Sequence, residues 1–167
     1  MSETIEGYRA GQELGASPWM RVRQADIDVF GSTTRDLEPL HNDPIWCDRN
    51  SPYDAPIAYG FQTLSYLTYF LHQATDGKFS GAHDTEDFPI NCGFDRVRLI
   101  TPVLSGSEIR GVFKIGGLEK RRPGELRLTL DFEVQIKGAD KPAAVGQWVY
   151  LWVTGEGTKA VSRSAPS

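Results

Sequence analysis

The order of secondary-structure signals along the chain is the feature that most constrains its fold. Residues 60–74 carry apolar side chains at three- and four-residue steps, which predicts one long helix buried on most sides. Strand-like segments follow, separated by short stretches with Gly or Pro, at residues 91–100, 108–118, 126–136 and 142–153. A helix followed by successive strands is buried most simply when an antiparallel sheet curls around it. We therefore expect an α+β fold with a curved antiparallel sheet wrapped around a long central helix.

Two of these segments indicate which strand faces are buried. In residues 126–136, Leu, Phe, Val and Ile occupy alternate positions and polar residues lie between them, so one face is buried and the other is solvated. Residues 142–153 become apolar on both faces towards their end. This pattern predicts a central strand or a subunit contact.

Shorter elements are predicted around the long helix. Residues 19–22 favour a strand, and residues 24–32 favour a short helix with acidic residues near its start. The Asp-Pro pair at residues 43–44 can begin a helical turn that reaches about residue 49. Residues 50–55 form a turn-rich link. Residues 75–89 are rich in Gly, Asp and Ser, which is typical of a surface loop that either connects two elements or covers a substrate mouth.

Length and composition favour one globular domain. The chain has 167 residues, 40% of them hydrophobic, which is enough to bury a core. We assign residues 1–154 to this domain and expect the small, polar residues 155–167 to form a disordered tail. No apolar run is long enough to span a membrane and no signal-peptide pattern opens the chain, so a cytoplasmic location is the default expectation.

Charge and metal-ligand spacing argue against several classes of partner. The formal net charge of −4, without clustered Lys, Arg and aromatic residues, argues against nucleic acid. The basic run at residues 120–122 is predicted to be a solvated hairpin tip, or else to lie near a coenzyme A phosphate. Cys47 and Cys92 stand apart and are expected to be reduced thiols, and the histidines are not at ligand spacing. We expect neither a metal nor another cofactor.

An acid and an imidazole lie close together at Asp36 and His41. Pro39 between them disfavours a helical conformation at Glu38, which predicts an irregular segment from which both side chains project. A carboxylate and an imidazole in one cleft can hold a water, one taking its proton and the other supplying a proton to carbon. Alternatively, Asp36 caps a turn and His41 satisfies a structural hydrogen bond.

The start of the predicted long helix is a second candidate site. Gly60 is not preceded by Ser, Thr, Asp or Asn, so no side-chain acceptor is in place for the first free N–H groups. These donors can hold a carbonyl or an oxyanion, or can be satisfied by water. A glycine at this position also lets a ligand approach the backbone closely.

Taken in order, these motifs resemble the MaoC-like dehydratase family, which includes the R-specific enoyl-CoA hydratases and the NodN-like proteins. The resemblance starts at Asp36-x-x-Pro39-x-His41 and at the Pro-Ile-Ala-Tyr-Gly-Phe sequence of residues 56–61. It continues through residues 93–98, 102–103, 106 and 109–111 and so covers most of the chain. The first block is the more specific, because acid, proline, base and glycine recur in order at matching distances.

The resemblance implies a single hot-dog fold, usually paired into a homodimer, that acts on an acyl thioester. It also implies that Asp36 and His41 bind the catalytic water and that the Gly60 N–H holds the thioester oxygen. Coenzyme A would then be part of the substrate rather than a cofactor. Tyr59 and Tyr53 are candidate substrate-binding residues, with a buried core role as the alternative for each.

Three residues depart from the pattern of many R-specific hydratases: Arg35 replaces Gly, Glu38 replaces Asn and Tyr59 replaces His. The sequence therefore leaves three hypotheses. The first is a hydro-lyase that hydrates a trans-2-enoyl-CoA or dehydrates an (R)-3-hydroxyacyl-CoA. The second is a hot-dog acyl-CoA thioesterase, and the third is a non-catalytic subunit that binds an acyl thioester. Acyl length, the choice between coenzyme A and a carrier protein, and the side chain that delivers the proton are open at this point.

Overall fold

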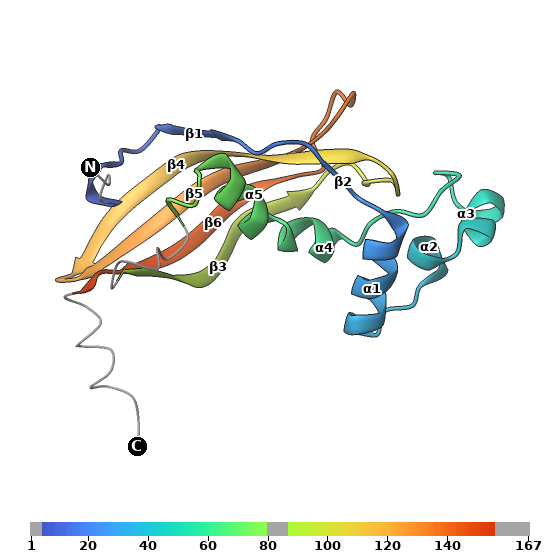
Figure 1. Ribbon diagram of the computed structural model, residues 1–167, viewed down its shortest axis with the longest axis horizontal. Coiled ribbons are helices and arrows are strands. Elements are labelled where there is room, and N and C mark those ends of the chain that lie inside the picture. The colour runs from blue at the N-terminus through green and yellow to red at the C-terminus, as the bar shows by residue number, and fades with distance from the viewer. Residues whose placement is uncertain (1–4, 80–86, 156–167) are drawn as a thin grey trace, which may run out of the picture.

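The computed structural model describes residues 5–79 and 87–155. It contains one antiparallel sheet, with α5 lying across it, α4 next to α5, and α1 to α3 gathered beyond one end (Figure 1). The helices are η1 (Ile5–Gly7), α1 (Gln24–Thr34), α2 (Pro39–Asn42), α3 (Pro44–Asn50), α4 (Gly60–Ser65) and α5 (Leu67–Ala74). The strands are β1 (Glu13–Ala16), β2 (Met20–Arg21), β3 (Phe88–Leu99), β4 (Glu108–Arg122), β5 (Glu125–Ile136) and β6 (Ala144–Val153).

The sheet confirms the predicted strands and gives their order. The strands follow the order β1-β4-β5-β6-β3, and β2 also pairs with β4. All of these pairings are antiparallel. β4 runs to Arg122, further than predicted, and a tight turn through Pro123 and Gly124 leads into β5, with Gly124 at a φ of 77°. β3 forms one edge of the sheet, so its outer backbone groups are not paired with any other strand in the described part of the chain.

The core lies on one face of β5 and β6. Alternate residues of β5 are buried, as predicted: Leu126, Leu128, Leu130, Phe132 and Val134. β6 lies between β5 and β3, and its consecutive residues 148–150 are all buried, which confirms the prediction of a central strand. The period of two in β5 therefore reports a half-buried strand, and its loss in β6 reports a strand covered on both faces.

The helix pair crosses the sheet closely because β4 carries a glycine beneath it. A Cβ atom at Gly111 would lie 2.6 Å from the Phe70 Cβ, closer than real side chains allow. Phe70, Leu67 and Leu71 of α5 are buried against the core. Each such side chain contributes about 1.5–3 kcal/mol when fully buried, so this contact fixes the helix to the sheet.

The predicted single helix over residues 60–74 is interrupted at Tyr66. Tyr66 keeps right-handed helical angles, with φ −72° and ψ −13°, but its N–H faces both the Gln62 and Leu64 carbonyls, which tightens one turn. The prediction of burial on most sides was also wrong, because each half keeps an exposed face. Phe61 in α4 is 80% exposed and Tyr69 in α5 is 46% exposed.

The predicted acid and base lie in the helical region beyond the end of the sheet (Figure 1). The prediction that His41 projects from an irregular segment was wrong. Pro39 occupies the first position of α2, where its missing N–H has no intrahelical partner to lose, so proline starts a helix here. His41 therefore lies on a short helix, and Asp36 lies in the connection that precedes it.

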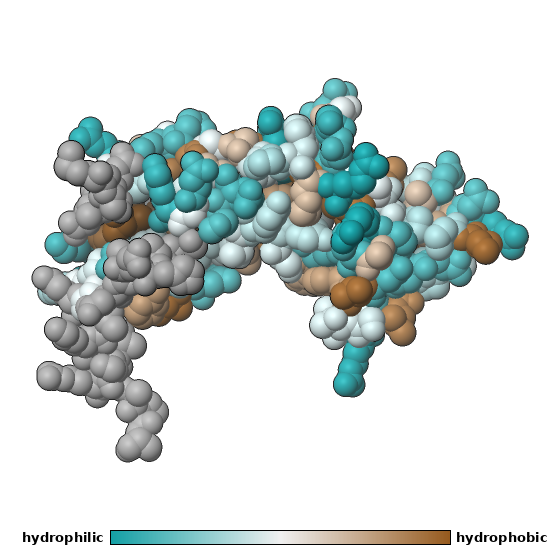
Figure 2. Space-filling view, viewed as in Figure 1, coloured by the Kyte–Doolittle hydropathy of each residue, from teal (hydrophilic) through white to brown (hydrophobic). Residues whose placement is uncertain are grey.

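Two predictions fall mainly on residues outside the described ranges. These are the tail, which is described only at residue 155, and the middle of the 75–89 loop, described at residues 75–79 and 87–89. None of the helices in the described ranges is long and apolar enough to cross a membrane. The visible surface is largely polar, with apolar residues at the end that carries α1 to α3 (Figure 2).

Candidate functional site

Asp36 lies where the chain reverses after α1. Arg35 ends the helix in a left-handed conformation, with a φ of 63°. The Asp36 N–H donates to the Gly31 carbonyl at 3.0 Å, and its Oδ1 accepts a long hydrogen bond of 3.4 Å from the Glu38 N–H. The side chain is exposed, so the carboxylate is accessible to water and to a ligand.

His41 is held in one orientation by the segment that precedes α4. Its Nδ1 lies 2.7 Å from the Ile57 carbonyl oxygen, and since a carbonyl only accepts, Nδ1 carries the proton of the neutral ring. Nε2 has no partner among residues 5–79 and 87–155 and is left as a proton acceptor. The ring is half-buried. This is the tautomer that a general base at Nε2 requires.

Tyr59 contacts both the imidazole and the Asp36 segment. Its ring stacks on the His41 ring with centroids 3.8 Å apart. Its hydroxyl donates to the Asp36 backbone carbonyl and accepts from the Asn42 side-chain amide at 2.8 Å. Tyr59 is only 4% exposed, so it lies behind His41, and its predicted contact with substrate stays a prediction. Asn42 was not singled out in the sequence.

Gly60 begins α4 next to a small apolar pocket. The residue before it makes no side-chain cap, and no acceptor for the Gly60 N–H lies within the described part of the chain. The pocket has a volume of about 170 Å³ and includes Ile57 and Gly60 in its lining, with Leu99 over the glycine. A Cβ at Gly60 would lie 2.3 Å from the Leu99 Cδ1, so any larger residue at this position would have to displace the tip of Leu99.

The segment before α4 is fixed by backbone hydrogen bonds from both sides. Ala58 donates to the Val103 carbonyl at 2.7 Å, and the Ile57 N–H donates to the Leu40 carbonyl at 3.1 Å. Ser105 donates to the Pro56 carbonyl at 2.9 Å. The segment thus pairs with the loop before β4 on one side and with α2 on the other. This is why His41, Tyr59 and Gly60 have a defined arrangement.

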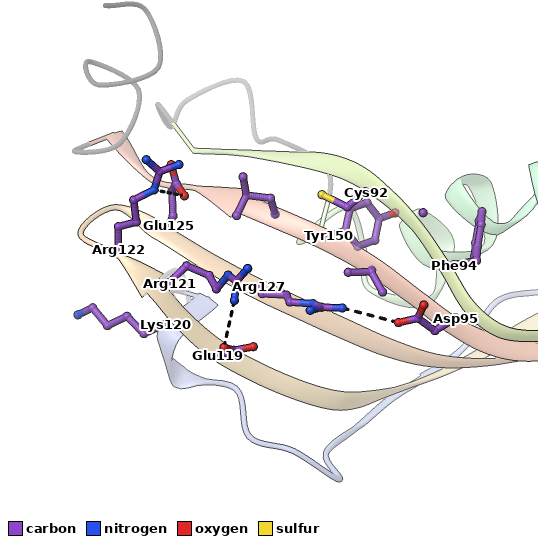
Figure 3. A pocket seen from close by; sticks show the side chains of 13 residues that line it. Cys92, Phe94, Asp95, Glu119, Lys120, Arg121, Arg122, Glu125, Arg127 and Tyr150 are labelled. Carbon is purple, nitrogen blue, oxygen red and sulfur yellow. Dashed lines mark hydrogen bonds and ion pairs between the residues drawn. The ribbon is translucent and has the colours of Figure 1, made fainter. Parts of the chain in front are cut away.

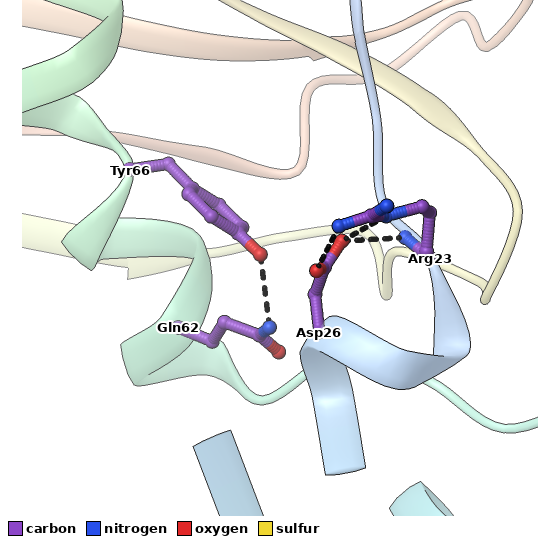
Figure 4. Close-up of polar contacts among 4 residues, drawn as sticks. All are labelled: Arg23, Asp26, Gln62 and Tyr66. Atoms are coloured by element: carbon purple, nitrogen blue, oxygen red, sulfur yellow. Dashed lines mark hydrogen bonds and ion pairs between the residues drawn. The ribbon is translucent and has the colours of Figure 1, made fainter. Parts of the chain in front are cut away.

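Two polar pairs lie near each other, Arg23 with Asp26 at the start of α1 and Gln62 with Tyr66 at the α4–α5 junction (Figure 4). Arg23 pairs with Asp26 at 2.7 Å, and this hydrogen-bonded charge pair holds the pKa of the Asp26 carboxyl below its usual value. Gln62, which is buried, donates to the Tyr66 hydroxyl at 2.9 Å. Burial raises the pKa of Tyr66. Each pair joins residues that are three or four positions apart, and neither includes Asp36 or His41.

Tyr53, the other predicted pocket residue, lies in the turn-rich link between α3 and α4. It is 39% exposed and does not line the apolar pocket. Of the two cysteines, Cys47 is buried and Cys92 is exposed, and both are free thiols as predicted. Burial raises the pKa of the Cys47 thiol.

A larger hollow than the apolar pocket lies elsewhere, on the sheet near the β4–β5 turn (Figure 3). It has a volume of about 680 Å³. Its guanidinium groups are paired with carboxylates, as in Arg127 with Asp95 at 3.6 Å and Arg122 with Glu125 at 3.0 Å. The basic run at residues 120–122 is at a hairpin tip, as predicted. Because the carboxylates of this hollow are paired with guanidinium groups and its lining contains no histidine, we place the chemistry at His41 instead.

Comparison with known proteins identifies the family. The family model described as a MaoC like domain matches residues 6–133. The chain belongs to the MaoC-like family. The predicted resemblance is therefore confirmed, over more of the chain than the short motifs alone.

Two relatives with similar sequences agree with this assignment. Nodulation protein N of Rhizobium meliloti (strain 1021) is 37% identical over 143 residues, 84% of each chain. The 3-hydroxyacyl-thioester dehydratase Z of Mycobacterium tuberculosis (strain CDC 1551 / Oshkosh) is 31% identical over 144 residues, covering 86% of this chain and 91% of the relative.

Solved structures show the fold. The (R)-hydratase of A. caviae, 23% identical, superposes with a TM-score of 0.69 over 87% of this chain and 98% of the hydratase. The monoamine oxidase regulatory protein of Archaeoglobus fulgius, 20% identical, has a TM-score of 0.76 over 92% of this chain and 98% of that protein. The predicted hot-dog fold is thus confirmed.

Proposed function

We propose that this protein is a hydro-lyase that adds water to a trans-2-enoyl-CoA or removes it from an (R)-3-hydroxyacyl-CoA. The observation that carries the proposal is the hydrogen bond from His41 Nδ1 to the Ile57 carbonyl, because Ile57 also lines the apolar pocket that reaches Gly60. Ile57 thus links His41, a base with a free Nε2, to a pocket that can hold an acyl group. The dehydratase relative and the (R)-hydratase neighbour support this class of reaction.

In the proposed hydration, the water oxygen bonds to C3 of the enoyl group and a proton is added at C2. Asp36 and His41 hold the water, one taking a proton from it and the other supplying the proton to C2. His41 acts through Nε2 in either role, because its Nδ1 is engaged with Ile57. Dehydration is the same path in reverse, so each residue exchanges its role.

Negative charge develops on the thioester oxygen as water adds, and Gly60 is the proposed donor to that oxygen. Gly60 lines the pocket beside Leu99, and a single positioned donor of this kind contributes about 3–4 kcal/mol in other enzymes. The substrate carbonyl must displace the tip of the Leu99 side chain. That movement is small, because Leu99 is 57% exposed at the end of β3.

We also propose that two copies pair through the free edge of β3. Apolar side chains on and just beyond this strand are exposed, including Ile90, Phe94, Leu99 and Ile100. A long unpaired edge with apolar side chains is unfavourable in water and is usually covered, and an antiparallel pair with a second β3 would cover it. Light scattering on the purified protein is expected to give a dimer mass, and a monomer at micromolar concentration would contradict this part of the proposal.

The decisive assay follows the loss of ultraviolet absorbance of the conjugated enoyl group across a panel of trans-2-enoyl-CoA chain lengths. We expect Asp36→Asn and His41→Ala each to lower kcat by about 100-fold or more. Glu38→Gln is the matched control, since it removes a neighbouring exposed carboxylate and is expected to leave the rate within a few-fold of wild type. If both dyad variants match wild type, the assigned roles are wrong.

The same samples separate the other two hypotheses. Release of free thiol from an acyl-CoA, measured against an enzyme blank, would identify a thioesterase. Binding of the thioester that is unchanged in His41→Ala, with no turnover by wild type, would identify a non-catalytic subunit. Loss of enoyl absorbance without thiol release is the outcome that supports a hydro-lyase.

A further inference from the structure

We infer that Tyr59 is the positioning residue that sets the geometry between Asp36 and His41. The inference rests on the proposed function and adds a role for a residue that neither touches the reacting atoms nor supplies a proton. Residues 57–60 make all the contacts on which the inference depends. Ile57 orients the imidazole, Tyr59 supports the ring and holds the Asp36 carbonyl, and Gly60 follows directly.

The hydroxyl of Tyr59 has a defined direction. Asn42 donates its Nδ2–H to the phenolic oxygen at 2.8 Å, so the phenol proton is directed to the Asp36 carbonyl, which can only accept. A phenol has one proton, and both polar neighbours therefore specify a single arrangement. Asn42 and His41 lie on the same short helix, so this contact also fixes α2 relative to Tyr59.

The position of Asp36 depends strongly on its hydrogen bond with the Tyr59 hydroxyl. Its peptide follows a left-handed residue, Arg35, and its carboxylate is exposed. Its backbone is held by its own N–H to Gly31 and by the Tyr59 hydroxyl on its carbonyl. Only the second bond comes from the segment that holds His41. Removing the hydroxyl therefore frees the acid relative to the base without removing either.

Space for the phenol is provided by a glycine in α1. A Cβ at Gly31 would lie 2.3 Å from the Tyr59 hydroxyl oxygen and 2.7 Å from the Asp36 carbonyl oxygen. Helix interiors usually avoid glycine, because it is less favourable there than alanine by about 1 kcal/mol. Its presence at the point where Tyr59 meets Asp36 is explained by this close approach.

The test is Tyr59→Phe, which keeps the aromatic ring against His41 and removes only the hydroxyl. We expect kcat to fall by about 10-fold or more with KM within about three-fold, since 10-fold corresponds to about 1.4 kcal/mol, the scale of one lost hydrogen bond. Tyr53→Phe is the matched control, because Tyr53 is exposed and does not line the pocket. It is expected to behave as wild type.

A double variant separates positioning from a general structural effect. In the Asp36→Asn background, Tyr59→Phe is expected to lower the residual rate by less than two-fold, because the residue through which it acts is already disabled. An equal loss in both backgrounds would overturn the inference. Asn42→Leu is the second variant, for the case that Tyr59→Phe does not fold. It keeps the phenol's bond to Asp36 but releases α2, which carries His41, from Tyr59, and it is also expected to lower kcat.

A measurement without substrate keeps this inference separable from the proposed function. Amide hydrogen exchange at Asp36 is expected to be about 10-fold or more faster in Tyr59→Phe than in wild type, while core amides of β5 are unchanged. If wild type hydrates no thioester but the Asp36 amide responds, the proposed function fails and the positioning role stands. Unchanged exchange at Asp36 together with unchanged kcat would overturn the positioning role.

Discussion

Gly31→Ala is the substitution for which local propensity and tertiary structure predict opposite signs. Gly31 lies inside α1, and alanine in a helix interior is more favourable than glycine by about 1 kcal/mol. From propensity alone, the variant would be more stable than wild type. The structure predicts the reverse, because the new Cβ would meet two atoms at less than 3.0 Å.

The size of the effect follows from the atoms that would be met. The Tyr59 hydroxyl, 2.3 Å away, is the end of a side chain that is itself buried, and the Asp36 oxygen, 2.7 Å away, belongs to the backbone. Neither can rotate away, so the helix or the Asp36 connection must shift. Overpacking costs about 1–3 kcal/mol, and two contacts below 3.0 Å place this site in the upper part of that range, at about 2–3 kcal/mol. After the propensity gain of about 1 kcal/mol, we expect the variant to be about 1–2 kcal/mol less stable.

Chemical denaturation and thermal melts measure this difference directly. For a domain of this length, about 1–2 kcal/mol corresponds to a decrease in Tm of about 2–8 °C. Gly117→Ala is the matched control, since nothing lies within 4 Å of its added Cβ. The double variant with Tyr59→Phe is expected to lose less than the sum of the single losses, because one of the two contacts is relieved. A Gly31→Ala protein more stable than wild type would refute the close approach of α1, Tyr59 and Asp36.

Three further predictions use other parts of the chain. Leu99→Ala opens the 170 Å³ pocket and is expected to shift the enoyl-CoA panel towards longer chains, while unfolding midpoints change little because Leu99 is 57% exposed. A thiol reagent is expected to label Cys92 in the folded protein and Cys47 only after denaturation, because Cys47 is buried and burial raises its pKa. Burial also raises the pKa of Tyr150, so the stabilising effect of its neutral form is complete below the unfolded pKa of about 10 and is lost as pH rises above it. Tyr150→Phe should therefore flatten the alkaline fall in unfolding free energy by up to about 1.4 kcal/mol per pH unit.

Patterns with a strong period were enough to predict the sheet. The alternation in residues 126–136 predicts which side chains of β5 are buried, since a strand has only two faces. The interruption at Tyr66 was not predictable in this way. It depends on how the curved sheet supports α5 but not α4, and this is a property of the whole fold and not of the helix sequence.

Proline shows why the same residue can be misread. A proline in the interior of a helix ends it, whereas a proline in the first turn can start a helix. Which of the two occurs depends on whether the preceding helix has already ended. Here Arg35 ends α1 in the left-handed region, so Pro39 is free to begin α2. An arginine gives no signal for that conformation, because glycine or asparagine is the usual residue there.

The candidate site depends on contacts that cannot be derived from the spacing of residues in the sequence. The positions of Asp36, His41 and Gly60 were proposed from residue type and order, but the link between them passes through a buried tyrosine and a helix glycine. An isolated glycine in a helical segment is a sequence signal that could have pointed to this link but was not used, since it lowers helix stability and needs a packing reason. At Gly31 that reason is Tyr59.

This arrangement also explains how a tyrosine can stand where many R-specific hydratases have a histidine. The residue before Gly60 is buried behind the base and contacts it through an aromatic face, a contact that either a phenol or an imidazole ring can make. Compared with histidine, tyrosine adds a hydroxyl group that extends beyond the ring to the Asp36 carbonyl. A Tyr59→His variant should therefore keep the ring contact with His41 but lose the hold on Asp36, and its kcat should resemble that of Tyr59→Phe. A Tyr59→His protein with the full wild-type rate would show that Asp36 is placed by other contacts.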